Sequence, residues 1–340
     1  MRDLAWHLHS RRGRTLPKEE CLRLVAGLLS DFSRSDLTPE QVLQLLSHGQ
    51  GLLREQDDGH YAFVHFTFQE YFVAQYIKEF RDETLVLHSL GDPWWEEVTL
   101  LYAGAIPDAS TLLARLLASD DQGRSLEDVF LSKLILAGRC LAERPRVSKP
   151  GLRQQVIGRL CTQFLLTEFQ FTRRHLANTL AEIGRAAPAE SAPDGASSLN
   201  QWLLTHLRET TGPFAPSPDL QRAILRALGN YGSPSLVGAL IDLLIQSVNA
   251  NNADIYAIVD TAIERLAQPE ETLFLRLLTL VRDPQAQPAL AMRAAYLLAV
   301  TGTARSASML LTDLTHTNLA NVVRGGLAYS CALLSNTATV

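Results

Sequence analysis

Residues 61–74, Tyr-Ala-Phe-Val-His-Phe-Thr-Phe-Gln-Glu-Tyr-Phe-Val-Ala, place the end of a strand directly before the start of a helix. A short turn, Asp57-Asp58-Gly59-His60, separates this strand from the apolar and polar residues 51–56. An Asp-Gly pair between two short strands favours a hairpin, because glycine tolerates the positive φ of a tight turn. The segment therefore predicts a β-hairpin whose second strand leads without a linker into a helix.

Three helical patterns precede this hairpin. Leu4, Ala5 and Leu8 lie on one side of a short first helix, and helical spacing of apolar residues predicts a second from about Pro17 to Phe32. In residues 38–41, Thr-Pro-Glu-Gln, we expect an N-cap, a proline in the first turn and a capping-box partner. The order helix, helix, helix, hairpin, helix is that of a winged-helix domain, which we place at residues 1–80.

Beyond about residue 80 the strand signals stop, and the chain becomes a succession of helices. We expect a helical connector over residues 81–118 and a helical repeat array over 119–340. In the clearest repeat a helix ends in a glycine-bearing turn near Leu228, and a second apolar helix follows. Leu266 and Leu298 occupy equivalent places, at steps of 38 and 32 residues. Periods of this size indicate stacked helical pairs, and the pattern resembles HEAT-like repeats. The predicted fold class is mainly α.

Composition excludes several classes of function. The formal net charge of -5 argues against general nucleic-acid affinity, because binding to phosphates needs a basic face. No apolar run approaches the ~18 residues of a membrane span, and no signal-peptide core follows Met1. The four cysteines lie far apart, without metal-ligand or disulfide spacing, and are expected to be reduced and buried. We expect a cytoplasmic protein with no membrane partner.

His65 is the candidate binding residue. Thr67 and Glu70 have the spacing of a second capping box, which would place His65 at a helix N-terminus. Such a site favours anions, since unpaired N–H groups and the helix dipole point outward. A working capping box uses some of those donors, so a second interpretation remains open. In that interpretation His65 is a partly buried histidine that bonds a backbone carbonyl.

Residues 63–74 closely resemble the Phe-x-His-x-Thr-Phe-Gln-Glu-Tyr-x-x-Ala stretch in the winged-helix domain of NACHT-type signalling NTPases. This family belongs to the STAND class and includes bacterial relatives of NOD-like receptors. The resemblance extends over about residues 4–118, where Leu52-Leu53 and residues 95–98 also fit the pattern. It implies that His65 contacts the β-phosphate of ADP in a closed resting state. It also implies packing roles for Phe63, Phe68, Tyr71, Phe72 and Ala74.

The ATPase core that precedes the winged helix in this family has no counterpart in these residues. No Gly-x-x-x-x-Gly-Lys-Ser/Thr occurs among the 340 residues, so neither the loop that wraps the phosphates nor its lysine is present. We therefore expect no catalytic residues, no metal ligands and no enzymatic activity. ATP or ADP would be a cofactor only in combination with an ATPase domain, and His65 would contact it only then.

Other candidate sites have simpler explanations. His7 and His9 suggest a metal pair, but residues two apart on a helix point in different directions. Residues 10–14, Ser-Arg-Arg-Gly-Arg, form a basic cluster that a DNA-binding winged helix could use, although solvated loop charges explain it better. Trp94 and Trp95 could be an exposed binding anchor, and we favour packing between the winged helix and the array.

The sequence thus favours a non-catalytic regulatory or sensor portion of a NACHT-type protein. Its array would recognise a protein partner or signalling ligand, and its winged helix would transmit that event to an upstream NACHT ATPase domain. The resemblance implies a role in bacterial immune-type signalling. The alternative is a stand-alone HEAT-like interaction scaffold, and a distant one is a winged-helix DNA binder.

Overall fold

The structure is a computed structural model of the 340-residue chain. It describes residues 1–31, 37–49, 51–56, 59–80, 83–118, 129–188, 190, 192–193, 195, 198–208, 218–250, 252–303, 305–315 and 319–336. The chain divides into two compact units, Met1–Leu160 and Cys161–Val340. Each unit has its own elements and its own core.

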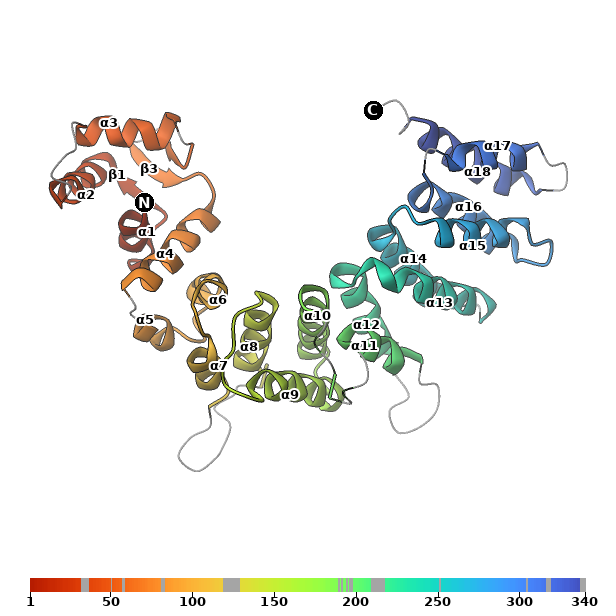
Figure 1. Ribbon diagram of the computed structural model, residues 1–340, viewed down its shortest axis with the longest axis horizontal. Helices are drawn as coiled ribbons and strands as arrows, with labels where there is room; N and C mark the ends of the chain where they lie inside the picture. The colour runs from red at the N-terminus through yellow and green to blue at the C-terminus, as the bar shows by residue number, and fades with distance from the viewer. Residues whose placement is uncertain are drawn as a thin grey trace. The chain divides into compact units, whose positions relative to one another are not determined.

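The first unit opens with the expected winged-helix elements (Figure 1). The predicted order of helix, helix, helix, hairpin and helix is confirmed, with one additional strand. The elements are α1 (Arg2–Ser10), β1 (Thr15–Pro17), α2 (Lys18–Asp31), α3 (Pro39–Gln44), the π-helical turn η1 (Leu45–Gly49), β2 (Leu53–Glu55), β3 (His60–Phe63) and α4 (Phe66–Phe80).

The sheet has three strands in the order β1-β3-β2, and both pairs are antiparallel. β1, with the sequence Thr-Leu-Pro, was not predicted, because three residues are too few to show an alternating pattern. It forms because β3 has a second edge, on which Leu16 pairs with Tyr61, and both of these side chains are buried. Pro17 ends the strand, so the second helix begins at Lys18.

Two boundaries, the start of α3 and the hairpin turn, were predicted correctly from residues close in sequence. Thr38 accepts a hydrogen bond from the backbone N–H of Gln41, and the Gln41 side chain accepts one from the backbone N–H of Thr38. The capping box is therefore confirmed. Gly59 has a φ of 75° in the hairpin turn, as the Asp-Gly signal requires. Asp57 and Asp58 lie outside the described residues.

The remainder of the first unit is helical. α4 packs against both α1 and α6, and the residues of α4 that face them are buried. Val73, Ala74 and Ile77 are completely buried, so the contacts of α4 with α1 and with α6 form part of the core of this unit. The further elements are α5 (Glu83–His88), the 3₁₀ turn η2 (Pro93–Trp95), α6 (Glu96–Ala105), α7 (Ser110–Leu116), α8 (Ser132–Ala142) and α9 (Leu152–Leu166), which continues into the second unit.

The second unit is a stack of helices in pairs (Figure 1). α11 packs on α12, α13 on α14, α15 on α16, and α17 on α18. The most extensive contacts between pairs join even-numbered helices, α10 to α12, α12 to α14 and α16 to α18, while α13 also touches α16. The elements are α10 (Gln170–Ala186), α11 (Leu199–Arg208), α12 (Pro218–Tyr231), the 3₁₀ turn η3 (Pro234–Leu236), α13 (Val237–Asn249), α14 (Ala253–Leu266), α15 (Glu271–Arg282), α16 (Pro288–Thr301), α17 (Ser306–Leu314) and α18 (Asn321–Asn336).

The predicted fold class is confirmed, because a winged helix is followed by an α-helical array. Leu228, Leu266 and Leu298 lie at matching places, near the ends of α12, α14 and α16. Each of these helices is followed by the expected second apolar helix. The likeness to HEAT repeats and the domain boundaries at residues 80 and 118 remain predictions.

Consecutive even-numbered helices approach closely where a glycine faces a small residue. A Cβ on Gly229 of α12 would lie 2.9 Å from the Cβ of Ala262 on α14. A Cβ on Gly326 of α18 would lie 2.9 Å from the Cβ of Ala295 on α16. Since real Cβ atoms do not approach so closely, the missing side chain sets the spacing of these helices.

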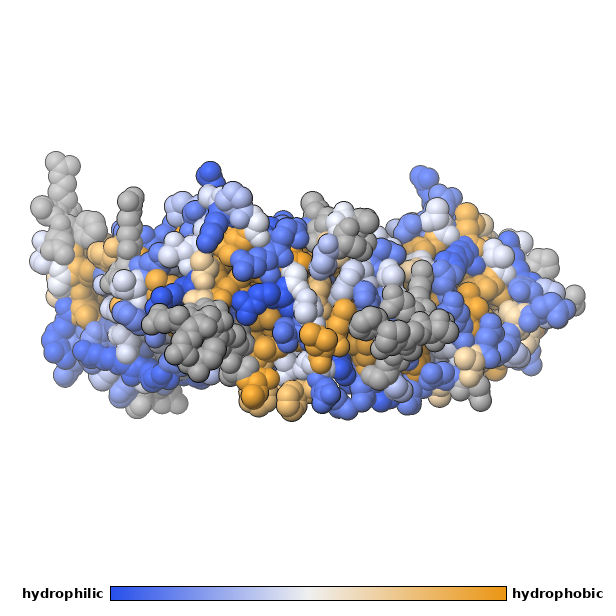
Figure 2. All heavy atoms as spheres, turned by 90° about the horizontal axis from the view of Figure 1, so that it is seen from below, coloured by the Kyte–Doolittle hydropathy of each residue, from blue (hydrophilic) through white to orange (hydrophobic). Residues whose placement is uncertain are grey.

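The apolar residues lie mainly inside. On the face shown in Figure 2, hydrophilic residues are interspersed with smaller hydrophobic areas. The four cysteines are free and buried, as expected: Cys21, Cys140, Cys161 and Cys331. Among the described helices, none combines the length and the apolar character needed to cross a membrane.

Candidate functional site

His65 lies on the connection between β3 and α4. The backbone of the preceding residue is fixed by a 3.1 Å hydrogen bond from the Val64 N–H to the Leu52 carbonyl. The His65 carbonyl accepts a 3.0 Å hydrogen bond from the Phe68 N–H, which begins the first turn of the helix. The His65 side chain is exposed. The interpretation of a partly buried histidine is therefore wrong, and the imidazole is available to a partner.

The capping box predicted for Thr67 and Glu70 is also wrong. α4 begins at Phe66, so Thr67 lies inside the helix instead of preceding it. Glu70 is only 7% exposed and belongs to the helix face that packs toward α1 and α6. Helical periodicity explains this, because Glu70 lies three and four residues from the buried Val73 and Ala74. Tertiary packing therefore prevailed over the local capping pattern.

The residues of the motif divide between the interior and the surface. Phe63 and Ala74 are buried, as the predicted packing role requires, and Phe72 is half-buried. Phe68 and Tyr71 do not have that role, since they are 37% and 45% exposed. The His65 and Phe68 rings lie 5.7 Å apart. Val64, His65, Phe68 and Tyr71 are all exposed, and we call these four residues the His65 patch.

A buried histidine that the motif did not indicate lies on the other side of α4. His9, on α1, is 0% exposed and stacks on Trp94 with ring centres 4.8 Å apart. Its ring also meets Trp95 edge-on at 4.7 Å. Burial lowers the pKa of His9 to about 4, so the imidazole is neutral at pH 7. The signal in the sequence was its place four residues after Ala5, on the apolar side of the first helix.

The two tryptophans are packing residues, as favoured from the sequence, but their described contacts are with the winged helix and not between it and the array. The Trp94 indole N–H donates a 3.0 Å hydrogen bond to the His9 carbonyl. The Trp95 ring lies 5.9 Å from that of Trp6. Both tryptophans therefore hold the segment before α6 against α1. They pack on the winged helix itself.

Glu70 has an unusual electrostatic environment. Burial raises the pKa of Glu70 to about 7, and the nearby carboxylate of Glu97 raises it further, while Arg14 opposes the change. Arg14 itself lies over the Phe66 ring, 4.6 Å from its centre. A buried carboxyl group of this kind titrates near neutral pH, on the same helix that carries Phe68 and Tyr71.

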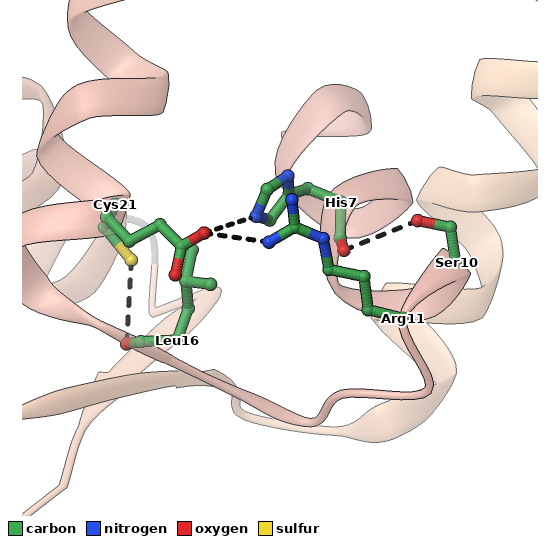
Figure 3. A network of polar contacts seen from close by, with 6 residues as sticks. His7, Ser10, Arg11, Leu16 and Cys21 are labelled. Atoms are coloured by element: carbon green, nitrogen blue, oxygen red, sulfur yellow. Dashed lines mark hydrogen bonds and ion pairs between the residues drawn. The ribbon is translucent and has the colours of Figure 1, made fainter.

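His7 and His9 point to different neighbours, as their helical spacing predicts. Figure 3 shows His7 and Arg11 directed at one carboxylate. Their hydrogen bonds identify it as that of Glu20. The His7 Nε2 lies 2.8 Å from its Oε1, and the Arg11 Nη1 donates to the same oxygen at 2.9 Å. These two hydrogen bonds lower the pKa of Glu20, with the bond to His7 the larger cause. Within the described ranges, no group of three acidic, histidine or cysteine side chains could hold a metal ion.

The basic cluster of residues 10–14 is engaged within the first unit. Arg11 pairs with Glu20, Arg12 forms an ion pair with Asp92, and Arg14 lies over Phe66. These contacts direct the guanidinium groups toward the protein's own residues. They agree with the interpretation of this cluster as ordinary surface charge.

These features define a winged-helix domain with an exposed histidine between its hairpin and its last helix. Residues 1–77 match the family described as "Winged helix-turn-helix domain C-terminal to NACHT". The match supports a NACHT-associated C-terminal region for this part of the chain, in agreement with the resemblance of residues 63–74. No curated protein matches the chain. No solved structure matches it either.

Proposed function

We propose that this chain is the non-catalytic regulatory and sensor portion of a NACHT-type signalling protein. The helical array recognises a ligand or a protein partner, and the winged helix transmits that event to a nucleotide-binding ATPase domain. Such a switch responds only to a partner that binds one of its states more tightly than the other. The exposed His65 patch is the observation that carries the proposal, because it presents an imidazole and three apolar side chains to solvent.

The chain alone does not fit a bound nucleotide. His65 is one exposed imidazole, and the 340 residues contain no phosphate-binding loop. We therefore assign the nucleotide to an ATPase domain, with His65 completing the site from outside as a hydrogen-bond donor. Val64, Phe68 and Tyr71 would supply the apolar contact around it, since they are 41%, 37% and 45% exposed.

The proposal is tested by finding and adding the ATPase domain. The DNA upstream of Met1 is translated in all frames, and any module there with a phosphate loop is purified and mixed with this chain. We expect binding that ADP strengthens. His65→Ala should weaken it about ten- to hundredfold, because a hydrogen bond to a charged group contributes about 1.5–3 kcal/mol. His48→Ala, which changes another exposed histidine of the same domain, should leave it unchanged.

Two results would overturn the proposal. Absence of any phosphate-loop module at the locus would favour a stand-alone helical scaffold. Binding that is equally strong with His65→Ala and with Tyr71→Ala would show that the His65 patch does not touch the ATPase domain.

The contacts of Arg11, Arg12 and Arg14 within the first unit count against a DNA-binding role. α3 adds to this argument, since its sequence Pro-Glu-Gln-Val-Leu-Gln has no basic residue.

A further inference from the structure

Four arginines surround one hollow between α10 and α12 in the second unit. The hollow has a volume of ≈ 360 Å³ and is lined by Gln170, Phe171, Arg173, Arg174, Asp219, Arg222, Ala223 and Arg226. Pockets for small molecules typically measure roughly 300–1,000 Å³. The chain as a whole has a formal net charge of -5, whereas this hollow concentrates positive charge. Neither the motif nor the proposed contact with an ATPase domain involves this hollow.

Two helix N-termini open at this hollow. Gln170, the first residue of α10, donates a 2.6 Å hydrogen bond to Asp219 in the first turn of α12. At the other ends of the same helices, the Arg185 guanidinium lies 5.6 Å from the centre of the Tyr231 ring. The two helices are therefore parallel. Their dipoles both place partial positive charge at the hollow, where anions are stabilised.

One arginine is held by the protein itself. Arg222 donates a 2.9 Å hydrogen bond to Asp219 and lies 3.6 Å from Asp254. The bond to Arg222 lowers the pKa of Asp219, so this carboxylate stays charged and holds Arg222 and Gln170 in place. Among the described residues that line the hollow, Asp219 is the one acidic side chain, and it is already engaged.

The other three arginines form no ion pair with a described residue, although the charge of Arg173 also acts on Asp219. Arg174 and Arg226 are exposed, and Arg174 lies over the Phe171 ring at 5.7 Å. Arg173 bonds the Thr167 carbonyl through Nη2, while its Nε is buried and has no hydrogen-bond partner among the described residues. The N-cap of α10, Phe169, provides no side-chain cap for the first N–H groups. Several donors thus converge here with unused hydrogen-bonding capacity.

The arginines at the hollow favour phosphate groups over carboxylates. A single arginine satisfies a carboxylate in a bidentate contact, whereas three guanidinium groups around a small hollow match the several oxygens and the higher charge of phosphate groups. Phe171, 56% exposed, supports the Arg174 guanidinium over its ring, and the ring also lies 4.4 Å from that of His175. The volume of ≈ 360 Å³ lies in the range of small-molecule sites.

We propose that the hollow between α10 and α12 is a binding site for a small phosphorylated ligand, held by Arg173 and Arg174 near the N-terminus of α10 and by Arg226 farther along α12. The inference deepens the proposed function, since it names the class of ligand that the array senses. It depends on that function only for the transmission of binding to the winged helix. The binding itself can be measured on this chain alone.

The test is calorimetric titration of the full chain with inorganic pyrophosphate and with ATP at low salt. We expect saturable binding that weakens as salt is added, because exposed charges are screened. Arg174→Ala and Arg226→Ala should each weaken it about tenfold, as expected for removal of a charge-assisted hydrogen bond. Arg305→Ala removes the same charge from an exposed position elsewhere in the unit and should have no effect.

Several outcomes would overturn the proposal. These are no binding of either probe, equal weakening with Arg305→Ala, and binding that is seen only with a phosphorylated peptide. Melting curves of each variant must match the parent protein.

A folded Arg226→Lys variant provides a second test, since lysine keeps the positive charge but cannot form two parallel hydrogen bonds to one phosphate. His65→Ala should leave phosphate binding unchanged, and Arg174→Ala should leave docking of an ATPase domain unchanged. The two proposals therefore fail separately.

Discussion

Arg282 of α15 donates two hydrogen bonds to Asp313 of α17, from Nε to Oδ1 and from Nη2 to Oδ2, each 2.9 Å long. The two side chains differ greatly in burial, since that of Arg282 is 51% exposed and that of Asp313 only 3%. The pair connects two successive helical pairs of the array. Its energetic importance should therefore depend on which partner is removed.

Removing Arg282 should cost more than removing Asp313. Arg282→Ala leaves a buried carboxylate without its donors and should destabilise the contact by about 2–3 kcal/mol. Asp313→Ala leaves an arginine that can turn to water, and about 1 kcal/mol is expected. Hydrogen exchange of the α15 and α17 amides measures both values. The double variant should be more stable than Arg282→Ala alone, and equal costs for the two single variants would contradict this account.

Gly229→Ala should loosen the contact between α12 and α14. The new Cβ would lie 2.9 Å from the Cβ of Ala262 and 3.1 Å from its Cα, so the two helices must separate. Overpacking of this kind costs about 1–3 kcal/mol, which hydrogen exchange in α12 and α14 would register as faster opening. Gly158→Ala is the matched control, because nothing lies within 4 Å of its new Cβ. It should be neutral or slightly stabilising, and the same destabilisation at both positions would refute the role of close approach.

Local signals predicted the elements of this fold better than its site. The hairpin, the capping box at Thr38 and the helices ending near Leu228, Leu266 and Leu298 depend on residues close in sequence, and all were predicted. β1 was not predicted, because a three-residue strand exists only through its pairing with β3.

The errors at the site have the same origin. Glu70 has the spacing of a cap, but packing of α4 against α1 and α6 buries it. Phe68 and Tyr71 are aromatic residues of the kind expected in a core. They nevertheless remain exposed, away from the contact of α4 with α1 and α6. The hollow near Arg174 and Arg226 joins residues 52 positions apart, so periodicity within one helix could not indicate it.

His9 should remain neutral well below the pH at which a free imidazole becomes charged. Its pKa in the folded chain is about 4, compared with an ordinary value of 6.5, and desolvation is the main cause. The folded state binds the proton less tightly than the unfolded state. The stability contributed by neutral His9 is therefore full above pH 6.5 and is lost as the pH falls through about 4.

Nuclear magnetic resonance of the imidazole protons tests this directly. The signal that disappears in His9→Gln identifies the residue, and its titration midpoint should lie near 4. A midpoint at 6.5 would mean that the ring is solvated instead of enclosed by Trp94 and Trp95.

Glu70→Gln should stabilise the first unit at alkaline pH. The pKa of Glu70 is about 7 in the folded chain and ordinarily 4.5, so the folded state binds the proton more tightly. Its favourable contribution is full below pH 4.5 and is lost as the pH rises through 7. Glutamine keeps the shape and stays neutral, so the variant and the parent should have equal stability at about pH 4.5. At about pH 8 the variant should be more stable by up to about 3 kcal/mol.

Urea unfolding followed by tryptophan fluorescence measures this difference for Glu70→Gln, since Trp6, Trp94 and Trp95 lie in the first unit. Titration of His9 cancels, because it affects both proteins. Glu19→Gln, at an exposed position of α2, should show no such pH dependence. A stability difference for Glu70→Gln that stays constant between acidic and alkaline pH would mean that the buried carboxyl is not protonated near neutral pH, because only a group whose pKa differs between the folded and unfolded states makes stability depend on pH.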